Sequence, residues 1–415
     1  MSAFAGRRFT VVTQFYWPEH VGIAPYSTRL AEHLVALGAT VDVITAMPHY
    51  PEWRIAPEYK GLLQRRELHE GVTVNRLWHY IPPRQSAVRR AAYEATLWLH
   101  AMGRRAPASD AVIGVIPSLS TGAIAREYAR RTSSRYGIVI QDLSAQGARQ
   151  SGIAGGGAVA SATSRVEGWV LSGAARVAVV SPRFQPHVEG FGVAPDRISV
   201  LRNWVEVDED ALASMTADDI RAIRASHGWG DDEVIVLHAG NMGLKQGLEH
   251  VVDAGRLASE RRLPVRFVLM GDGSQRPMIE ARANGVAGVQ FIPSQPRHVA
   301  NRMMAAADVL LVNERGSIVD MALPSKLTSY FAARKPVLAA VADGGTTAEE
   351  VQRSGGGLIV PPEDPESLLA AVQKVATDAT LASGLSERGA TYAQRELSAE
   401  ATLRQAERFV EALIE

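Results

Sequence analysis

Short runs of β-branched and aliphatic residues recur along the chain and alternate with segments in which apolar residues return every three or four positions. The first pattern is typical of strands and the second of amphipathic helices. Glycine or proline stands at many of the joints, which favours a parallel sheet covered by helices on both faces. The alternation forms two series. It therefore predicts an α/β protein with two doubly wound, Rossmann-like halves that flank a central cleft.

The first series contains predicted strands at Phe9–Phe15, Thr40–Thr45, Thr73–Trp78, Ala111–Ile116, Gly137–Gln141, Val177–Ser181 and Ile198–Leu201. The second contains predicted strands at Val234–His238, Val265–Met270, Val289–Ile292, Val309–Val312, Pro336–Ala340 and Leu358–Val360. Apolar residues at helical spacing from Tyr26 to Leu37 predict a helix after the first strand. Pro25 suits the first turn of that helix, and Gly38 suits the position just past its end.

These series divide the chain into an N-terminal domain, 1–203, and a C-terminal domain, 204–397, joined by an acidic connector at Trp204–Asp210. A length of 415 residues agrees with this division, because one domain typically has about 150 residues. The segment 398–415 carries an apolar stripe at helical spacing. We expect this C-terminal helix to cross back and pack on the N-terminal domain.

Composition narrows the functional classes. There are 44 Lys and Arg and 44 Asp and Glu, so no net positive charge draws the protein to nucleic acid. The absence of Cys excludes disulfides, thiol nucleophiles and Cys-ligated metal sites. Met1–Arg8 lacks the apolar run of a signal peptide, and no apolar stretch approaches the ~20 residues of a bilayer span. We therefore expect a cytoplasmic enzyme.

Ligands of open α/β sheets bind at the carboxyl ends of the strands, so the loops there are the candidates for chemistry. The loop after the first strand, Tyr16–Pro25, leads directly into a helix, whose N-terminus can face a ligand. It contains only Gly22, whereas the nicotinamide-dinucleotide fingerprint needs three glycines. This difference argues against a dehydrogenase.

The second half contains three turns suited to a diphosphate: Gly240–Gly247, Gly271–Gly273 and Leu323–Leu327. Glycines let backbone donors approach phosphate oxygens closely, and Lys245 and Lys326 add positive charge. The third turn also begins a helix, whose N-terminus stabilises a leaving diphosphate. The alternative is that the glycines only shape tight turns and both lysines are solvated.

The chain resembles glycosyltransferase family 4, and within it the bacterial branch with colanic-acid and O-antigen transferases. The order and spacing of several short motifs carry this resemblance across nearly the whole chain. They are Tyr16-Trp17-Pro18-Glu19 with Gly22 and Ile23, Ile44–Trp53, Gln141-Asp142-Leu143, Asn203-Trp204-Val205, Gly240–Leu248, Leu323-Pro324-Ser325-Lys326-Leu327 and Val360–Pro365.

The resemblance implies a GT-B fold, a nucleotide-sugar donor held by the C-terminal domain, a hydroxyl acceptor held by the N-terminal domain, and transfer with retention. It implies no metal and no other cofactor, because lysines and backbone donors would neutralise the departing diphosphate. The turns and the resemblance together predict catalytic roles for Lys245, Lys326, Asp320 and Asp142, donor contacts from Gly240, Asn241, Gly243, Gly271, Gly273, Pro324, Ser325 and Ser329, and acceptor-side positions at Gly22, His20 and Tyr16.

Two departures from the family pattern matter. Its paired glutamates are replaced here by Met321, with Asp320 beside it, and by Ser329, and many relatives have His where this chain has Gln141. Asp320 still suits a sugar hydroxyl, and Asp142 or His20 suits the acceptor. Alternatively, Asp320 is a loop-cap carboxylate, Asp142 is a helix N-cap, and His20 is a histidine of a surface loop.

Two further segments have open interpretations. Asp208 and Asp210 form an Asp-x-Asp pair, but they lie in the acidic connector and are interpreted as solvated linker rather than a metal site. The segment 84–106 interleaves arginines with Trp98, Leu99 and Met102, which suits weak peripheral contact with the inner face of a membrane. Alternatively, those apolar residues belong to the core or to a dimer contact.

The sequence therefore favours a retaining transferase that acts on a bacterial, lipid-linked glycan, or on a soluble natural-product acceptor. A nucleotide-sugar 2-epimerase and a catalytically weak nucleotide-sugar-binding protein are the alternatives. Fold analogy alone does not choose among them.

Overall fold

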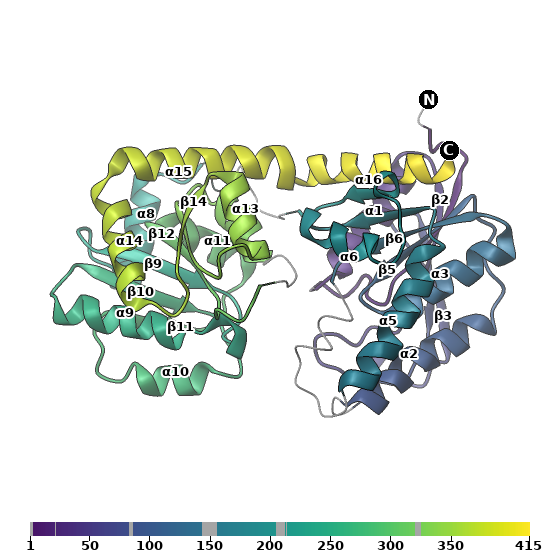
Figure 1. Cartoon of the computed structure of the whole chain (residues 1–415), viewed down its shortest axis with the longest axis horizontal. Coiled ribbons are helices and arrows are strands. Elements are labelled where there is room, and N and C mark those ends of the chain that lie inside the picture. Colours follow the sequence, from purple (N-terminus) through teal and green to yellow (C-terminus); the bar gives the residue numbers. More distant parts are fainter. Residues whose placement is uncertain are drawn as a thin grey trace. The chain divides into compact units, whose positions relative to one another are not determined.

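The protein was analysed as a computed structural model, which describes residues 3–20, 22–82, 86–142, 156–204, 212, 214–319 and 325–415. The chain forms two compact units, each built around one sheet (Figure 1). Unit 1 comprises Met1–Asn203 and Thr402–Glu415, and unit 2 comprises Trp204–Ala401. The last helix begins at Ala399 in unit 2, and from Thr402 onward it belongs to unit 1.

Unit 1 contains an eight-stranded sheet with the order β3-β4-β2-β1-β5-β6-β7-β8. Every neighbouring pair is parallel except β3 and β4. The strands are β1 (Arg8–Val12), β2 (Thr40–Ala46), β3 (Gln64–His69), β4 (Val72–Leu77), β5 (Ala111–Ile116), β6 (Arg135–Ile140), β7 (Arg176–Val179) and β8 (Ile198–Val200).

Helices cover both faces of this sheet. Residues that alternate along one strand enter different cores: Val12 packs with α2 and α3, whereas Val11 packs with α1 and α16. The helices are α1 (Ala24–Ala36), α2 (Ala87–Met102), α3 (Leu119–Thr132), α5 (Gly156–Ser172), α6 (Gln185–Glu189) and α16 (Ala399–Ile414), with short 3₁₀ turns at η1 (Pro57–Tyr59), η2 (Pro182–Phe184) and η3 (Pro195–Arg197).

The end of α16 completes the core of unit 1. Phe409, Val410 and Leu413 are at most 2% exposed and pack with residues of β1, β2 and α1. A Cβ on Gly137 of β6 would lie 2.7 Å from Cζ of Phe409, so the helix approaches the strand at a residue without a side chain. The His33 ring Nε2 also lies 2.7 Å from Oε1 of Glu407.

Unit 2 contains a six-stranded parallel sheet with the order β11-β10-β9-β12-β13-β14. Its strands are β9 (Val234–Ala239), β10 (Val265–Met270), β11 (Val289–Ile292), β12 (Val309–Asn313), β13 (Val337–Ala340) and β14 (Gly357–Val360). Its helices are α8 (Ala217–Ser226), α9 (Glu249–Glu260), α10 (Arg276–Arg282), α11 (Arg297–Ala306), α12 (Ser325–Ala332), α13 (Thr346–Ser354), α14 (Pro365–Thr377) and α15 (Ala379–Tyr392), with a 3₁₀ turn η4 (Leu244–Gln246) and a π-helical segment η5 (Ala393–Leu397).

The two faces of this sheet again bury separate cores, one under α11, α12 and α13 and the other under α9, α10 and α14. The fold predicted from the sequence, two doubly wound α/β halves, is confirmed. Each predicted strand has a counterpart, and the first helix ends as expected, with Gly38 at a φ of +92°. Within the described ranges, no helix combines the length and the hydropathy needed to cross a bilayer.

Two details differ from the predictions. The first strand stops at Val12 rather than at Phe15, because the chain leaves the sheet at Thr13 to form a loop with buried polar groups. The edge strand β3 was not predicted. Its sequence, Gln-Arg-Arg-Glu-Leu-His, is mostly polar because the strand is largely solvent-exposed, so it lacks an apolar pattern.

Candidate functional site

The carboxyl end of the unit 2 sheet holds two interlocked glycine turns, one after β9 and one after β10. A Cβ on Gly271 would lie 1.8 Å from the carbonyl oxygen of Gly240, and one on Gly273 would lie 2.6 Å from Oδ1 of Asn241. The Met242 N–H donates to the carbonyl of Asp272 at 2.8 Å. These contacts leave no room for larger side chains, so both turns require glycine.

Lys326 lies beside the first of these turns. A Cβ on Gly240 would be 3.9 Å from the Lys326 ammonium nitrogen, which comes from the first turn of α12. Burial lowers the pKa of Lys326 to about 8, and the negative charge of Glu314 opposes this shift. A cation therefore lies against the glycine turn, close to the N-terminus of a helix.

Glu314 is a functional candidate that the sequence did not suggest. It directly follows β12, and both of its carboxylate oxygens accept from Oγ1 of Thr347, at 3.1 and 2.9 Å. Burial raises the pKa of Glu314, while the Thr347 hydrogen bond and then the charges of Lys326 and Lys245 oppose the rise. The Arg315 N–H, one residue after Glu314, donates to the Lys245 carbonyl at 2.9 Å, so the loop that carries Lys245 lies at the end of β12, beside this carboxylate.

The backbone around Lys245 is held by residues that follow β12. The Asn313 side-chain amide donates to the carbonyl of Gln246 at 2.6 Å, and the Arg315 N–H donates to the carbonyl of Lys245 at 2.9 Å. The Arg315 guanidinium also forms an ion pair with Glu249. Lys245 therefore projects as an exposed side chain from a fixed loop.

Tyr330 fixes α12 against the sheet. The Ala239 N–H donates to the Tyr330 hydroxyl at 2.8 Å, and that hydroxyl lies 3.4 Å from the carbonyl of Leu311. Lys326 is one helical turn before Tyr330, so this anchor positions its backbone. Ser329 is half-buried on the same helix, and Asn241 is exposed in the β9 turn beside Gly243.

Several predicted residues cannot be compared with the structure. Asp320, Met321 and Pro324 lie outside the described residues, as do Asp208 and Asp210. Ser325 begins α12, but its side chain is not described. Across the described ranges, no three His, Asp or Glu side chains gather as a metal-ligating group.

The predicted acceptor-side residues lie in the loop after β1 of unit 1. Tyr16 is fully buried in the core beside α1, and its hydroxyl has no hydrogen-bond partner among the described residues. His20 is exposed, and Gly22 has a φ of +64°. Asp142 comes two residues after the end of β6, at the same edge of the sheet. The structure therefore places His20 and Asp142, but not the Tyr16 side chain, at accessible positions.

A buried carboxylate joins two loops at this edge. Oε1 of Glu19 accepts the backbone N–H groups of His49 and Tyr50, each at 2.8 Å, and Oε2 accepts that of Tyr16 at 3.3 Å. Burial raises the pKa of Glu19 to about 6 although these donors oppose the rise. Glu19 belongs to the Trp-Pro-Glu motif, which was the signal available in the sequence.

Two buried histidines lie next to this carboxylate. His49 Nε2 is 2.9 Å from the Tyr93 hydroxyl, and the rings of His49 and His79 are 4.8 Å apart. Burial lowers the pKa of His49 to about 4 and that of His79 well below its usual value. Both rings are therefore neutral at pH 7. Both ring nitrogens of His79 lack a hydrogen-bond partner within the described part of the chain.

Comparisons with known proteins agree with the two units. A family described as "Glycosyl transferase 4-like domain" matches residues 21–204, and one described as "Glycosyl transferases group 1" matches residues 233–378. The chain is 31% identical over 403 residues to the putative colanic acid biosynthesis glycosyl transferase WcaI of Escherichia coli K12. That alignment covers 94% of this chain and 96% of the relative.

Solved structures show the same fold. Sucrose-phosphate synthase from Thermosynechococcus elongatus superposes with a TM-score of 0.70 at 17% identity, covering 98% of both chains. HepE from Anabaena, solved in complex with UDP-glucose, superposes with a TM-score of 0.67 at 14% identity, covering 98% of this chain and 99% of that one.

Proposed function

The chain belongs to glycosyltransferase family 4, has the GT-B fold, and we propose that it moves a sugar from a nucleoside-diphosphate sugar bound at unit 2 to a hydroxyl acceptor bound at unit 1. One observation carries this proposal: the Lys326 ammonium lies against the Gly240 turn, 3.9 Å from where a Cβ would stand, in a turn that requires glycine. The backbone of Lys245 is held near the end of the neighbouring strand β12, where its carbonyl accepts the Arg315 N–H at 2.9 Å. HepE, with a similar fold, was solved with UDP-glucose, which supports a nucleotide-sugar donor.

The lysines neutralise the diphosphate. The sugar–phosphate bond breaks as negative charge develops on the departing phosphate, and donors fixed near that charge lower the barrier. Lys326 and Lys245 supply positive charge, while the Gly240 and Gly271 turns let backbone groups approach. Asn241, Gly243, Gly273, Pro324, Ser325 and Ser329 complete the proposed donor site. No divalent ion is needed in this scheme, so transfer continues in EDTA.

Transfer retains the anomeric configuration. The acceptor oxygen forms its bond to C1 on the face that the diphosphate leaves, and the acceptor proton passes to the departing phosphate oxygen. This route needs no protein nucleophile, so the enzyme contributes positioning and charge stabilisation. Asp320 accepts a donor-sugar hydroxyl, and Asp142 and His20 orient the acceptor near Gly22.

The acceptor is a bacterial, lipid-linked glycan. Support comes from the relative WcaI, whose name refers to colanic acid biosynthesis, and from the surface of α2. On this helix Val88 is 81% exposed and Leu99 is 60% exposed, with Trp98 beside it and an exposed Arg89 near the start. An exposed apolar face with nearby arginines suits weak contact with an anionic membrane.

The membrane contact is tested by sedimentation with vesicles of phosphatidylcholine containing phosphatidylglycerol. We expect binding at low salt that falls as salt rises, and weaker binding by Leu99→Asp than by the matched control Leu68→Asp, whose leucine is 73% exposed on β3. No binding at low salt would count against the contact.

The reaction is tested with a panel of UDP-, GDP- and dTDP-sugars, with and without a lipid-linked or a soluble acceptor. Nucleotide release that rises with acceptor, together with an unchanged anomeric configuration by NMR, supports the proposal. Sugar conversion without nucleotide release identifies an epimerase instead, and binding without turnover identifies a binding protein. A requirement for a divalent cation after EDTA contradicts the charge-stabilisation scheme.

A further inference from the structure

An arginine-lined pocket lies in unit 1, and none of its lining residues belongs to the proposed sugar-transfer site. It has a volume of about 640 Å³. Its charged lining consists of four arginines and one aspartate, Arg8, Arg104, Arg105, Arg131 and Asp110, beside small residues of the same loops.

The pocket lies at the amino edge of the sheet. Arg8 begins β1, Asp110 immediately precedes β5, and β1 and β5 pair in parallel. The end of α3 supplies Arg131. Sugar transfer is assigned to the carboxyl edge, where open α/β sheets bind ligands, so this pocket is a separate site that does not depend on the proposed reaction.

Two of the charged groups are already paired. The Asp110 carboxylate accepts the Arg8 backbone N–H at 2.7 Å and lies 3.8 Å from the Arg7 guanidinium. Arg131 donates to Glu127 at 2.8 Å and to the carbonyls of Met102 and Arg104, each at 3.1 Å. Arg131 thereby fixes the loop that follows α2, and this gives the pocket a rigid wall.

The other three arginines have their positive charge available. Within the described ranges, the guanidinium groups of Arg8 and Arg105 form no hydrogen bond or ion pair. Arg104 has one weak contact, from its guanidinium to the His100 ring at 3.5 Å. Three exposed arginines that line one pocket without a carboxylate bound to their guanidinium groups give this concave site an excess of positive charge.

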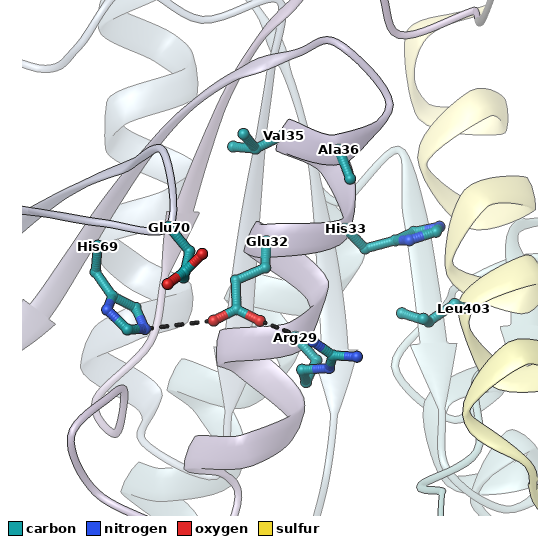
Figure 2. Close-up of a pocket in the computed structure, with 8 residues that line it drawn as sticks. All are labelled: Arg29, Glu32, His33, Val35, Ala36, His69, Glu70 and Leu403. Carbon is teal, nitrogen blue, oxygen red and sulfur yellow. Dashed lines mark hydrogen bonds and ion pairs between the residues drawn. The ribbon is translucent and has the colours of Figure 1, made fainter.

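A second pocket of unit 1 provides a contrast (Figure 2). It has a volume of about 590 Å³ and lies beside α1. Its one arginine is paired: Glu32 lies 3.2 Å from Arg29 and 3.3 Å from the His69 ring. The pocket also contains a second carboxylate, Glu70. That pocket therefore has no excess of positive charge for an anion, whereas the arginine pocket has more arginines than carboxylates.

We propose that the arginine pocket binds a phosphate group. Guanidinium forks match the geometry of phosphate oxygens and form paired, charge-assisted hydrogen bonds with them. The phosphate comes either from an anionic lipid headgroup or from a soluble phosphate compound. The exposed Trp98 and Leu99 lie near the same end of α2, next to the loop that carries Arg104 and Arg105.

The first arm of the test uses inorganic pyrophosphate in calorimetric titrations of the full chain. Arg8→Gln/Arg105→Gln is expected to weaken one binding event by about tenfold or more, because two charged donors are removed. The matched control Arg66→Gln/Arg408→Gln removes the same charge from exposed positions outside the pocket and is expected to bind as the wild type does. Lys326→Ala, which alters the proposed donor site, retains the event that the pocket variant loses.

The second arm uses vesicles of phosphatidylcholine with and without phosphatidylglycerol. A loss of phosphatidylglycerol-dependent sedimentation by the pocket variant, but not by the control, identifies a lipid headgroup as the source. Pyrophosphate binding without any such loss identifies a soluble phosphate. The proposal is overturned if the pocket variant matches the wild type in both arms, or if the control variant loses as much binding as the pocket variant.

Discussion

Oε1 of Glu19 accepts the backbone N–H of His49 at 2.8 Å, and this bond ties the loop after β1 to the loop after β2. Both loops follow the carboxyl ends of their strands, at the edge where unit 1 is proposed to bind its acceptor. A single buried carboxyl group therefore shapes the backbone of that edge, and its protonation state has measurable consequences.

Glu19 makes the stability of the protein depend on pH. Because the pKa of Glu19 is raised from 4.5 to about 6 in the folded state, its contribution is fully present below pH 4.5 and is lost as pH rises through 6. The shift corresponds to roughly 2 kcal/mol. Urea denaturation should show the wild type losing about this much unfolding free energy relative to Glu19→Gln between pH 4 and 7. The control Glu52→Gln, at an exposed position, should show the same pH dependence as the wild type. If the unfolding free energies of wild type and Glu19→Gln change with pH in parallel, the raised pKa of Glu19 is contradicted.

Lys326→Ala is expected to lower kcat far more than it raises the KM for the acceptor. The ammonium group acts on charge that develops at the departing phosphate, and removing one such donor typically costs about 100- to 1,000-fold in kcat. Steady-state kinetics against acceptor concentration measure both parameters. Lys374→Ala, which removes an exposed lysine of α14, is the control. An unchanged kcat would remove Lys326 from the mechanism.

The pH profile of kcat/KM is expected to report Lys326. Its pKa of about 8 predicts that activity falls as pH rises through 8, because the neutral amine no longer stabilises phosphate. The negative charge of Glu314 raises the pKa of Lys326, so Glu314→Gln should move this limb to lower pH. The exposed Glu387→Gln should leave the limb in place, and a limb that does not move in Glu314→Gln argues against the coupling.

Gly271→Ala is expected to damage the donor site. The new Cβ would lie 1.8 Å from the Gly240 oxygen, so the turn beside Lys326 must move. Gly285→Ala is a matched control, since it also has a positive φ, +75°, but has no atom within 4 Å of the new Cβ. Gly285→Ala loses about 1 kcal/mol through backbone strain, and Gly271→Ala loses more, because its φ of +144° is combined with the clash. Only Gly271→Ala should also weaken nucleotide binding, by about tenfold or more, in a thermal-shift titration. Wild-type affinity in Gly271→Ala would refute the role of this turn.

The sequence predicted most of the fold because its parallel strands are buried, and burial produces continuous apolar runs. It also located the turns at Gly240 and Gly271, because a glycine that follows a predicted strand is a local signal in the sequence. Glu314 was missed although it lies only two residues after the predicted strand Val309–Val312. Its significance depends on Thr347, which lies 33 residues later and meets it only in the folded chain.

The same limit applies to unit 1. Glu19 and His49 belong to separate motifs of the family resemblance, and nothing in the sequence indicates that they are in contact, because 30 residues separate them. The lowered pKa values of His49 and His79 arise from burial, and a single histidine in a sequence carries no sign of that environment. Tyr16 illustrates the opposite case, because a residue in a promising loop turns its ring into the core.

The position of α16 has a consequence for synthesis of the chain. Unit 1 takes Phe409, Val410 and Leu413 from a segment that is translated only after the whole of unit 2, Trp204–Ala401. While the ribosome adds unit 2, the face of the unit 1 sheet that α1 and α16 share is covered, among the described helices, by α1 alone. The unit that is made first therefore finishes folding last, and a nascent chain offers chaperones an apolar surface for much of its translation.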